Sequence, residues 1–241
     1  MNAVYTRYEI VQTLRNRRLI FFSLGLPLLL FLLVAGPNRH QQLGGLAFPV
    51  YYMTGMVSWG TMAAVMATGS RIAAERADGW NRHLRVSPLP ARAYFAAKAA
   101  TGYLLALISM AVLSIAAAFI GVRLSASGWL IMTGLVLVGL IPFTVLGVLI
   151  GHLVTSDAIG PATGGTTALF ALLGGSWGPL AQTGTLHRIA EALPSYWLVQ
   201  AARAAIDQTD WPLRAWVVVA VWTGLLTVLA TRAYRRDTAR P

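Results

Sequence analysis

The sequence predicts an all-α integral membrane protein with six transmembrane helices, on the basis of three observations. Hydrophobic residues make up 56% of the 241 residues and charged residues only 11%, far below the about 25% that is usual in soluble domains. Six segments are near or above the roughly 20 apolar residues that cross a bilayer. Basic residues gather in alternate connections between these segments. We therefore predict one transmembrane domain, residues 1–241, embedded in the lipid bilayer.

The predicted spans are residues 19–36, 47–70, 94–120, 129–151, 159–180 and 213–231. The first is too long for the apolar core of a signal peptide and is followed by no small-x-small cleavage site, so we interpret it as an uncleaved span. Glycine and proline interrupt the fifth span, which membrane helices tolerate where neighbouring helices satisfy the freed backbone.

The distribution of basic residues predicts the orientation. Fourteen of the 19 lie before the first span, in residues 71–98 or after the last span. The positive-inside rule then places both termini and the loop after the second span in the cytoplasm, and an even number of spans agrees. The net charge of +11 is mostly this topology signal, with added attraction to anionic lipid. We expect no nucleic-acid partner.

Residues 1–18 form an amphipathic stretch. Its apolar residues recur at helical spacing: Val4, Tyr8, Val11 and Leu14. This pattern predicts an interfacial helix lying along the inner leaflet. The alternative is a solvated basic tail.

The loop of residues 71–93 is too long for a simple turn. Helix-compatible residues run to Asp78, where Gly79 can end the helix. A short second helix with Trp80, Leu84 and Val86 on its apolar side would then follow, stopped by Pro88. A charged hairpin of this kind is suited to docking on another protein. A basic loop that only sets topology fits these residues equally well.

Residues 181–212 would lie on the outer side. The stretch from Leu193 to Arg203 is too short and too polar to span. It would lie in the outer interface or dip into the membrane and return, with Tyr196 and Trp197 as interfacial anchors.

Several kinds of chemistry have no sequence support. With no cysteine, disulfides and thiolate metal sites are excluded, and the four histidines show no ligand spacing, so we expect no metal. No phosphate-binding G-x-x-x-x-G-K-[ST] loop is present, since the only lysine, Lys98, precedes Ala99. All eight acids fall in predicted loops or tails, which argues against ion-coupled transport. Any energy for work must come from another subunit.

Three glycine pairs have G-x-x-x-G spacing and permit close helix approach. They are Gly147/Gly151, Gly160/Gly164 and Gly174/Gly178. Packing within the chain and a dimer face explain them equally well.

The loop resembles the signature of ABC-2 type permeases, the membrane subunits of certain bacterial ABC exporters. That signature runs as an acid, a charged residue, a glycine, Leu and Ser-Pro, and is matched here by Glu75, Arg76, Gly79, Leu84, Ser87, Pro88 and Leu89. The chain departs from the family pattern at Trp80 and Arg82, where Thr and an acid are usual. The Arg15-Asn16-Arg17-Arg18 run, and Pro194 and Tyr196 followed by Arg203, are also similar to the family.

The resemblance implies that residues 75–88 form a coupling helix seated on a separate ATP-binding subunit. Its coupling residues would be Glu75, Arg76, Asp78, Gly79, Leu84, Ser87 and Pro88. Two permease copies, identical or paralogous, would surround a path in the bacterial cytoplasmic membrane. ATP and Mg would bind to the partner ATPase, with no cofactor on this chain. An outer gate would comprise Pro194, Tyr196, Trp197 and Arg203.

The function that the resemblance implies is ATP-driven export of an amphipathic small molecule or lipid by alternating access, as in the daunorubicin-resistance type. One alternative is export of a polysaccharide along an aromatic path, for which Tyr52, Trp59 and Trp177 are candidates. Another is a stand-alone membrane enzyme or an assembly factor. Its only available polar cluster would be His83 with Glu75 and Asp78.

Overall fold

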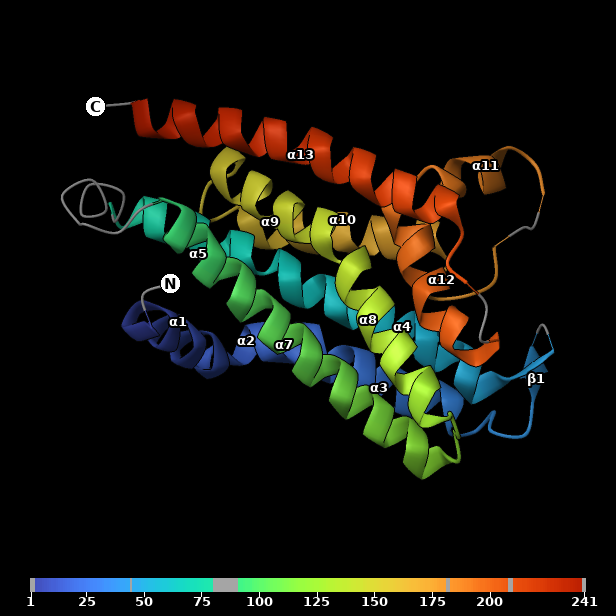
Figure 1. The fold of residues 1–241 in the computed structure, drawn as a ribbon. Coiled ribbons are helices and arrows are strands. Elements are labelled where there is room, and N and C mark those ends of the chain that lie inside the picture. The colour runs from blue at the N-terminus through green and yellow to red at the C-terminus, as the bar shows by residue number, and fades with distance from the viewer. Residues whose placement is uncertain (1–2, 44, 80–90, 181–182, 208–209, 240–241) are drawn as a thin grey trace.

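The computed structural model describes residues 3–43, 45–79, 91–180, 183–207 and 210–239. Over these residues the chain forms a bundle of helices and one short hairpin (Figure 1). The helices are α1 Ala3–Arg15, α2 Arg17–Ile20, the π-helix η1 Phe21–Gly25, α3 Leu26–Ala35, α4 Phe48–Met66, α5 Thr68–Ala77, α7 Ala91–Ile120, α8 Ala126–Gly139, α9 Ile141–Leu153, α10 Ile159–Gly174, α11 Thr185–Glu191, α12 Pro194–Asp207 and α13 Leu213–Ala239. Strands β1 Gln42–Leu43 and β2 Leu46–Ala47 pair antiparallel.

The helical content and the apolar helices confirm an all-α membrane protein. Within the described ranges, three helices are long and apolar enough to cross a membrane: Ala93–Ile120, Ala126–Leu153 and Leu213–Asp237. The other predicted spans correspond to shorter pieces. The first contains the apolar helix Phe21–Ala35, and the second is α4 continued by α5.

The fifth predicted span, residues 159–180, ends earlier than expected. Helix α10 stops at Gly174, because Gly175 takes a left-handed conformation with φ of 76° and caps the helix. At 16 residues, α10 is about 24 Å long, shorter than the roughly 30 Å of a bilayer core. The prediction of a full-length helix here was wrong.

Helix α4 forms the centre of the bundle. It packs against α3, α7, α9, α10 and α12, and Met53, Met56 and Val57 are fully buried. A helix that is apolar on all sides is expected in the middle of a bundle. Large apolar side chains on outer helices are exposed instead, including Phe119 at 88% and Leu213 at 79%. Such a surface is suited to lipid.

Helix α1 turns its polar side inward. Thr6, Glu9 and Thr13 are buried, whereas Tyr8 and Val11, from the predicted apolar side, are exposed. The segment is thus a helix packed against α7 and not a solvated tail.

The glycine pairs have different environments. A Cβ on Gly151 would lie 2.7 Å from the carbonyl oxygen of Gly69, so α5 and α9 cross at glycines within the chain. Gly174 is similarly close to Ser195. A Cβ on Gly160 or Gly164 would meet nothing within 4 Å in the described part of the chain. This glycine pair therefore faces away from the other described helices.

The two ends of the bundle differ in what they carry (Figure 1). Both chain termini and the end of α5 lie at one end. The β1–β2 hairpin, α11 and α12 lie toward the other.

Candidate functional site

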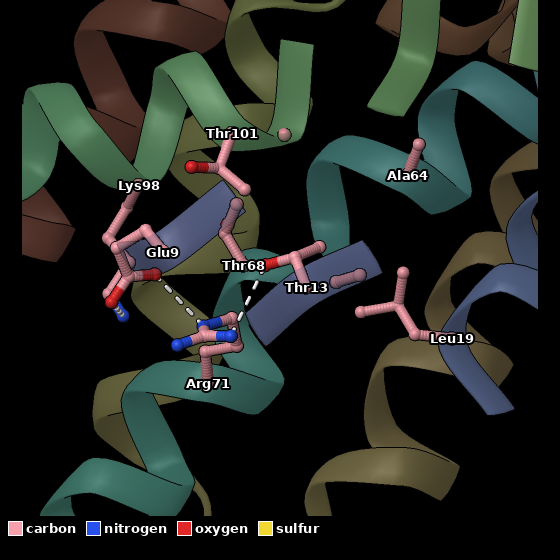
Figure 2. Close-up of a pocket in the computed structure, with 10 residues that line it drawn as sticks. Glu9, Thr13, Leu19, Ala64, Thr68, Arg71, Lys98 and Thr101 are labelled. Carbon is pink, nitrogen blue, oxygen red and sulfur yellow. Dashed lines mark hydrogen bonds and ion pairs between the residues drawn. The ribbon is translucent and has the colours of Figure 1, made fainter. Parts of the chain in front are cut away.

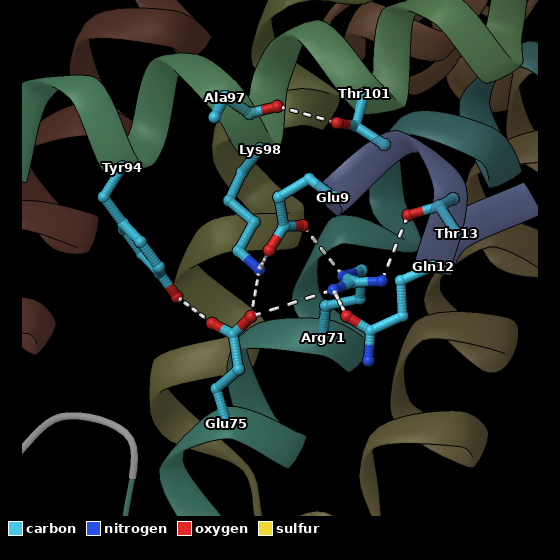
Figure 3. Close-up of polar contacts among 9 residues, drawn as sticks. All are labelled: Glu9, Gln12, Thr13, Arg71, Glu75, Tyr94, Ala97, Lys98 and Thr101. Carbon is cyan, nitrogen blue, oxygen red and sulfur yellow. Dashed lines mark hydrogen bonds and ion pairs between the residues drawn. The ribbon is translucent and has the colours of Figure 1, made fainter. Parts of the chain in front are cut away.

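A buried lysine joins three helices at the end of the bundle that carries the termini. Lys98 on α7 and Glu9 on α1 are each 1% exposed, and Lys98 Nζ lies 2.9 Å from Glu9 Oε1. Lys98 Nζ also donates to Glu75 Oε1 on α5. One cation thus ties α1 and α5 to α7 (Figure 3).

Arg71 completes this cluster from one turn earlier on α5. Its Nε lies 3.0 Å from Glu9 Oε2 as an ion pair without hydrogen-bond alignment. Its Nη2 donates to Gln12 Oε1 at 2.6 Å, and the Tyr94 hydroxyl donates to Glu75 Oε2 at 2.6 Å. Two cations face two carboxylates, so the buried charge is balanced.

The electrostatics of Glu9 follow from these neighbours. Burial raises the pKa of the carboxyl, but the charge and hydrogen bond of Lys98, with the charge of Arg71, outweigh burial and hold the pKa below its ordinary value. Glu9 is therefore ionised at neutral pH.

A cavity of about 10 Å³ lies beside the cluster (Figure 2). Threonines at positions 13, 68 and 101 line it together with Lys98 and Arg71. This volume is about that of one water-sized sphere, so the cavity is too small for a transported substrate. The polar side chains here hold helices together.

A second network is formed on the other side of α5. Arg76 Nε lies 2.6 Å from Asp237 Oδ2 on α13, and its Nη1 donates to the carbonyl oxygens of Gly151 and Val154 at the end of α9. A cation is favourable there, because the last carbonyls of a helix are unpaired and carry partial negative charge. His152 Nδ1 lies 3.1 Å from the same carboxylate.

The predicted coupling residues take three different positions. Glu75 and Arg76 are partly buried and pair within the chain. Asp78 is exposed, and Gly79 follows with φ of 70°, so the predicted helix end is confirmed. Leu84, Ser87 and Pro88 lie outside the described residues, as does the predicted second helix.

The predicted outer-gate residues all belong to α12. Pro194 begins this helix, and Tyr196 packs edge-on against Trp197. Trp197 is only 6% exposed and donates its indole N–H to Glu191 O, so it is a packing residue and not the expected lipid-facing anchor. Arg203 donates to Gly175 O at 3.4 Å and thereby joins α12 to the end of α10.

The predicted path aromatics are mostly buried. Tyr52 and Trp59 on α4 are 9% and 8% exposed. The Trp59 ring meets that of Trp177 edge-on at 5.4 Å. Trp177 is 39% exposed, so it is the one of the three predicted residues with substantial exposure.

Sequence reasoning missed Glu9 and Lys98 as a pair. Lys98 was counted with the topology-setting charges, yet it is among the largest fully buried side chains of the described residues. The signal available was a lone lysine inside an apolar helix, where an ionisable group is costly unless paired. Asp237, counted as part of the tail, was missed in the same way.

Comparison with known proteins connects this architecture to a family. The model of the family described as "ABC-2 type transporter" matches residues 3–206. The chain belongs to this family. It is similar to "Putative transport permease YvfS" of Bacillus subtilis (strain 168), with 29% identity over 192 residues that cover 78% of each chain. The protein is thus a transport permease and a membrane protein, and its family implies an ABC transporter with an ATPase partner.

Proposed function

We propose that this permease is the membrane subunit of an ATP-driven exporter in the bacterial cytoplasmic membrane. It moves an amphipathic small molecule or lipid by alternating access, with energy from a separate ATPase subunit. Family membership supports the transport role, and the absence of a phosphate-binding lysine loop in the sequence supports a separate ATPase.

The observation that carries this proposal is the anchoring of the last turn of α5. Glu75 pairs with Lys98 on α7, and the next residue, Arg76, pairs with Asp237 on α13. Successive residues on a helix point about 100° apart, so the two networks hold α5 from different sides. Displacement of the connection after α5 by a docked ATPase would be passed to the helices of both networks.

The remaining topology is part of the proposal. Six crossings, the fifth made by the short α10 together with the residues after it, and both termini in the cytoplasm agree with the shared end of the two termini (Figure 1). The outward apolar side of α1, with Tyr8 60% exposed, supports an interfacial position on the inner leaflet. Residues 181–212 would lie near the outer leaflet, with Arg203 and its neighbours as the outer gate.

A second permease copy would complete the path. The open Gly160 and Gly164 on α10 support a helix–helix contact between copies. The burial of Tyr52 and Trp59 favours an amphipathic substrate over a polysaccharide, because a path for sugars needs accessible aromatic faces.

Co-purification tests the central claim. The tagged permease is isolated in mild detergent, and a P-loop ATPase is expected among the co-purifying proteins. Asp78→Arg reverses an exposed charge at the end of α5. We expect a loss of the ATPase of about fivefold, because an exposed ion pair contributes up to about 1 kcal/mol. Asp157→Arg is the matched control, because Asp157 is also exposed and follows the end of α9 that Arg76 contacts.

Glu75→Gln separates docking from coupling. Since Glu75 pairs inside the bundle, the variant should keep the ATPase but lose substrate stimulation of ATP hydrolysis. Absence of any ATPase beside the wild-type permease would refute the proposal. Equal loss in Asp78→Arg and Asp157→Arg would refute docking at this end of α5.

A further inference from the structure

One side of α13 is exposed along most of its length. Its apolar positions are each more than 50% exposed and comprise Val217, Val221, Leu225 and Val228. The next two positions at the same spacing, Arg232 and Arg236, are also exposed. Residues three and four apart lie on the same side of a helix, so these residues form one stripe, apolar first and then basic. The basic end of this stripe lies with both chain termini (Figure 1).

The opposite side of α13 makes the contacts with the rest of the protein. Ala230 and Ala233 are each 8% exposed and belong to an apolar cluster with α9. Asp237, in the same turn as Arg236, has its Oδ2 2.6 Å from Nε of Arg76 on α5. The folded position of this end therefore does not depend on the two arginines of the stripe, and they are available to a partner outside the chain.

The length of the stripe matches one membrane crossing. The apolar span of α13 begins at Leu213, and the stretch from there to Arg232 is about 28 Å long at 1.5 Å per residue. This is close to the roughly 30 Å of the hydrocarbon core. When Leu213 lies at one boundary of the core, Arg232 reaches the other, and Arg236 lies about one turn beyond it. Both guanidinium groups are then at the depth of the phosphates of lipid headgroups.

The arginine at the other end of the same helix is neutralised within the protein. Arg214 Nη1 lies 2.8 Å from Glu191 Oε2 on α11. Among the residues that the structure describes, Arg232 and Arg236 form no ion pair of this kind. Like charges four residues apart on a helix repel each other, and a phosphate between them would offset this repulsion, because guanidinium groups bind phosphate oxygens strongly. The end of α13 that lies with the termini therefore favours an anion.

We propose that Arg232 and Arg236 bind the headgroup of an anionic phospholipid whose acyl chains lie along the apolar part of the α13 stripe. A headgroup with net negative charge is favoured over a zwitterionic one, because the acid of this turn, Asp237, already pairs with Arg76 and does not hold an ammonium group. The bound lipid thereby fixes the turn of α13 to which α5 is ion-paired. Its assignment to the inner leaflet rests on the proposed topology, whereas its binding does not depend on ATP-driven export.

Native mass spectrometry of the delipidated permease tests the proposal with phosphatidylglycerol and phosphatidylcholine of matched acyl chains. The wild type should bind phosphatidylglycerol more tightly. An arginine near an anionic lipid surface contributes about 1 kcal/mol, or about fivefold in affinity. Arg232→Gln and Arg236→Gln should each weaken the binding of phosphatidylglycerol about fivefold, and the double variant should lose the preference between the two lipids. Binding is measured on the permease alone, so its failure is distinct from failure to recover an ATPase.

The matched control is Arg214→Gln, which makes the same change of charge at the ion-paired end of the same helix. It should change the binding of phosphatidylglycerol by no more than about twofold, because an exposed ion pair contributes little. Equal weakening in Arg214→Gln and Arg232→Gln would overturn the site in favour of general electrostatic attraction.

Three other results would also overturn the proposal. The first is equal binding of the two lipids by the wild type. The second is displacement of the lipid by inorganic phosphate beyond that caused by sodium chloride of the same ionic strength, which would make a free anion the ligand. The third is unchanged lipid binding in the variants: if either Arg232→Gln or Arg236→Gln fails to fold, the other decides, and unchanged binding in that variant would refute the site.

Discussion

Replacing Lys98 by methionine removes the cation that two carboxylates share at the end of the bundle. Lys98 and Glu9 are each 1% exposed with their charged atoms 2.9 Å apart. At this distance and an effective dielectric constant of about 20, the Coulomb attraction is about 6 kcal/mol. Desolvation offsets part of it, and removing one member of a buried pair typically costs about 3–5 kcal/mol. Lys98→Met should therefore lower the midpoint of thermal unfolding by about 6–20 °C.

The assay is thermal unfolding in mild detergent, followed by the fluorescence of the eight tryptophans. Arg214→Gln is the matched control, because Arg214 pairs with Glu191 at 2.8 Å while 56% exposed, and such pairs contribute at most about 1 kcal/mol. Adding Glu9→Gln to Lys98→Met should restore part of the stability, since the uncompensated charge is removed. Equal midpoints for Lys98→Met and Arg214→Gln would show that burial does not strengthen this pair.

Two further outcomes are expected. Gly151→Ala places a Cβ 2.7 Å from Gly69 O and should lower the free energy of unfolding by about 1–3 kcal/mol. Its control is Gly164→Ala, whose Cβ would meet no described atom within 4 Å. This variant should unfold at no lower temperature than wild type in the same assay. Because the pKa of Glu9 is held below its ordinary value, its contribution to stability is complete above about pH 4.3 and is lost as pH falls through the lowered pKa. The unfolding midpoint of wild type should then fall more steeply than that of Glu9→Gln as the pH falls below about 4.3, and parallel curves would contradict this.

The features predicted well from sequence are those set by local signals. The end of α5 was predicted because Gly79 follows Asp78, and the helix ends there with Asp78 as its C-cap. The helical spacing of Tyr8 and Val11 predicted α1, and these residues form its exposed side. A stop signal or a periodic pattern lies within a few residues, so it can be read without knowing the fold.

The features that were missed depend on distant residues. Glu9 and Lys98 are 89 positions apart, and neither has a local pattern that indicates its partner. Trp197 was expected at the lipid interface but is buried, because an amphipathic aromatic suits a protein interior equally well when its N–H finds a carbonyl, here Glu191 O.

The position of Gly79 relative to the two ion-pair networks determines how a displacement of the connection after α5 would be transmitted to the bundle. The ion pairs of Glu75 and Arg76 fix the last turn of α5 to α7 and α13. Their partners Lys98 and Asp237 are only 1% and 11% exposed, so breaking either pair would leave a largely buried charge without a partner. Gly79 lies just beyond them with φ of 70°, and a Cβ at this position would meet no atom of the described residues within 4 Å. A change of the backbone dihedral angles at Gly79 therefore costs less free energy than one within the last turn of α5. A displacement too large for the backbone of Gly79 to accommodate must move α5 together with α7 and α13, to which it is ion-paired.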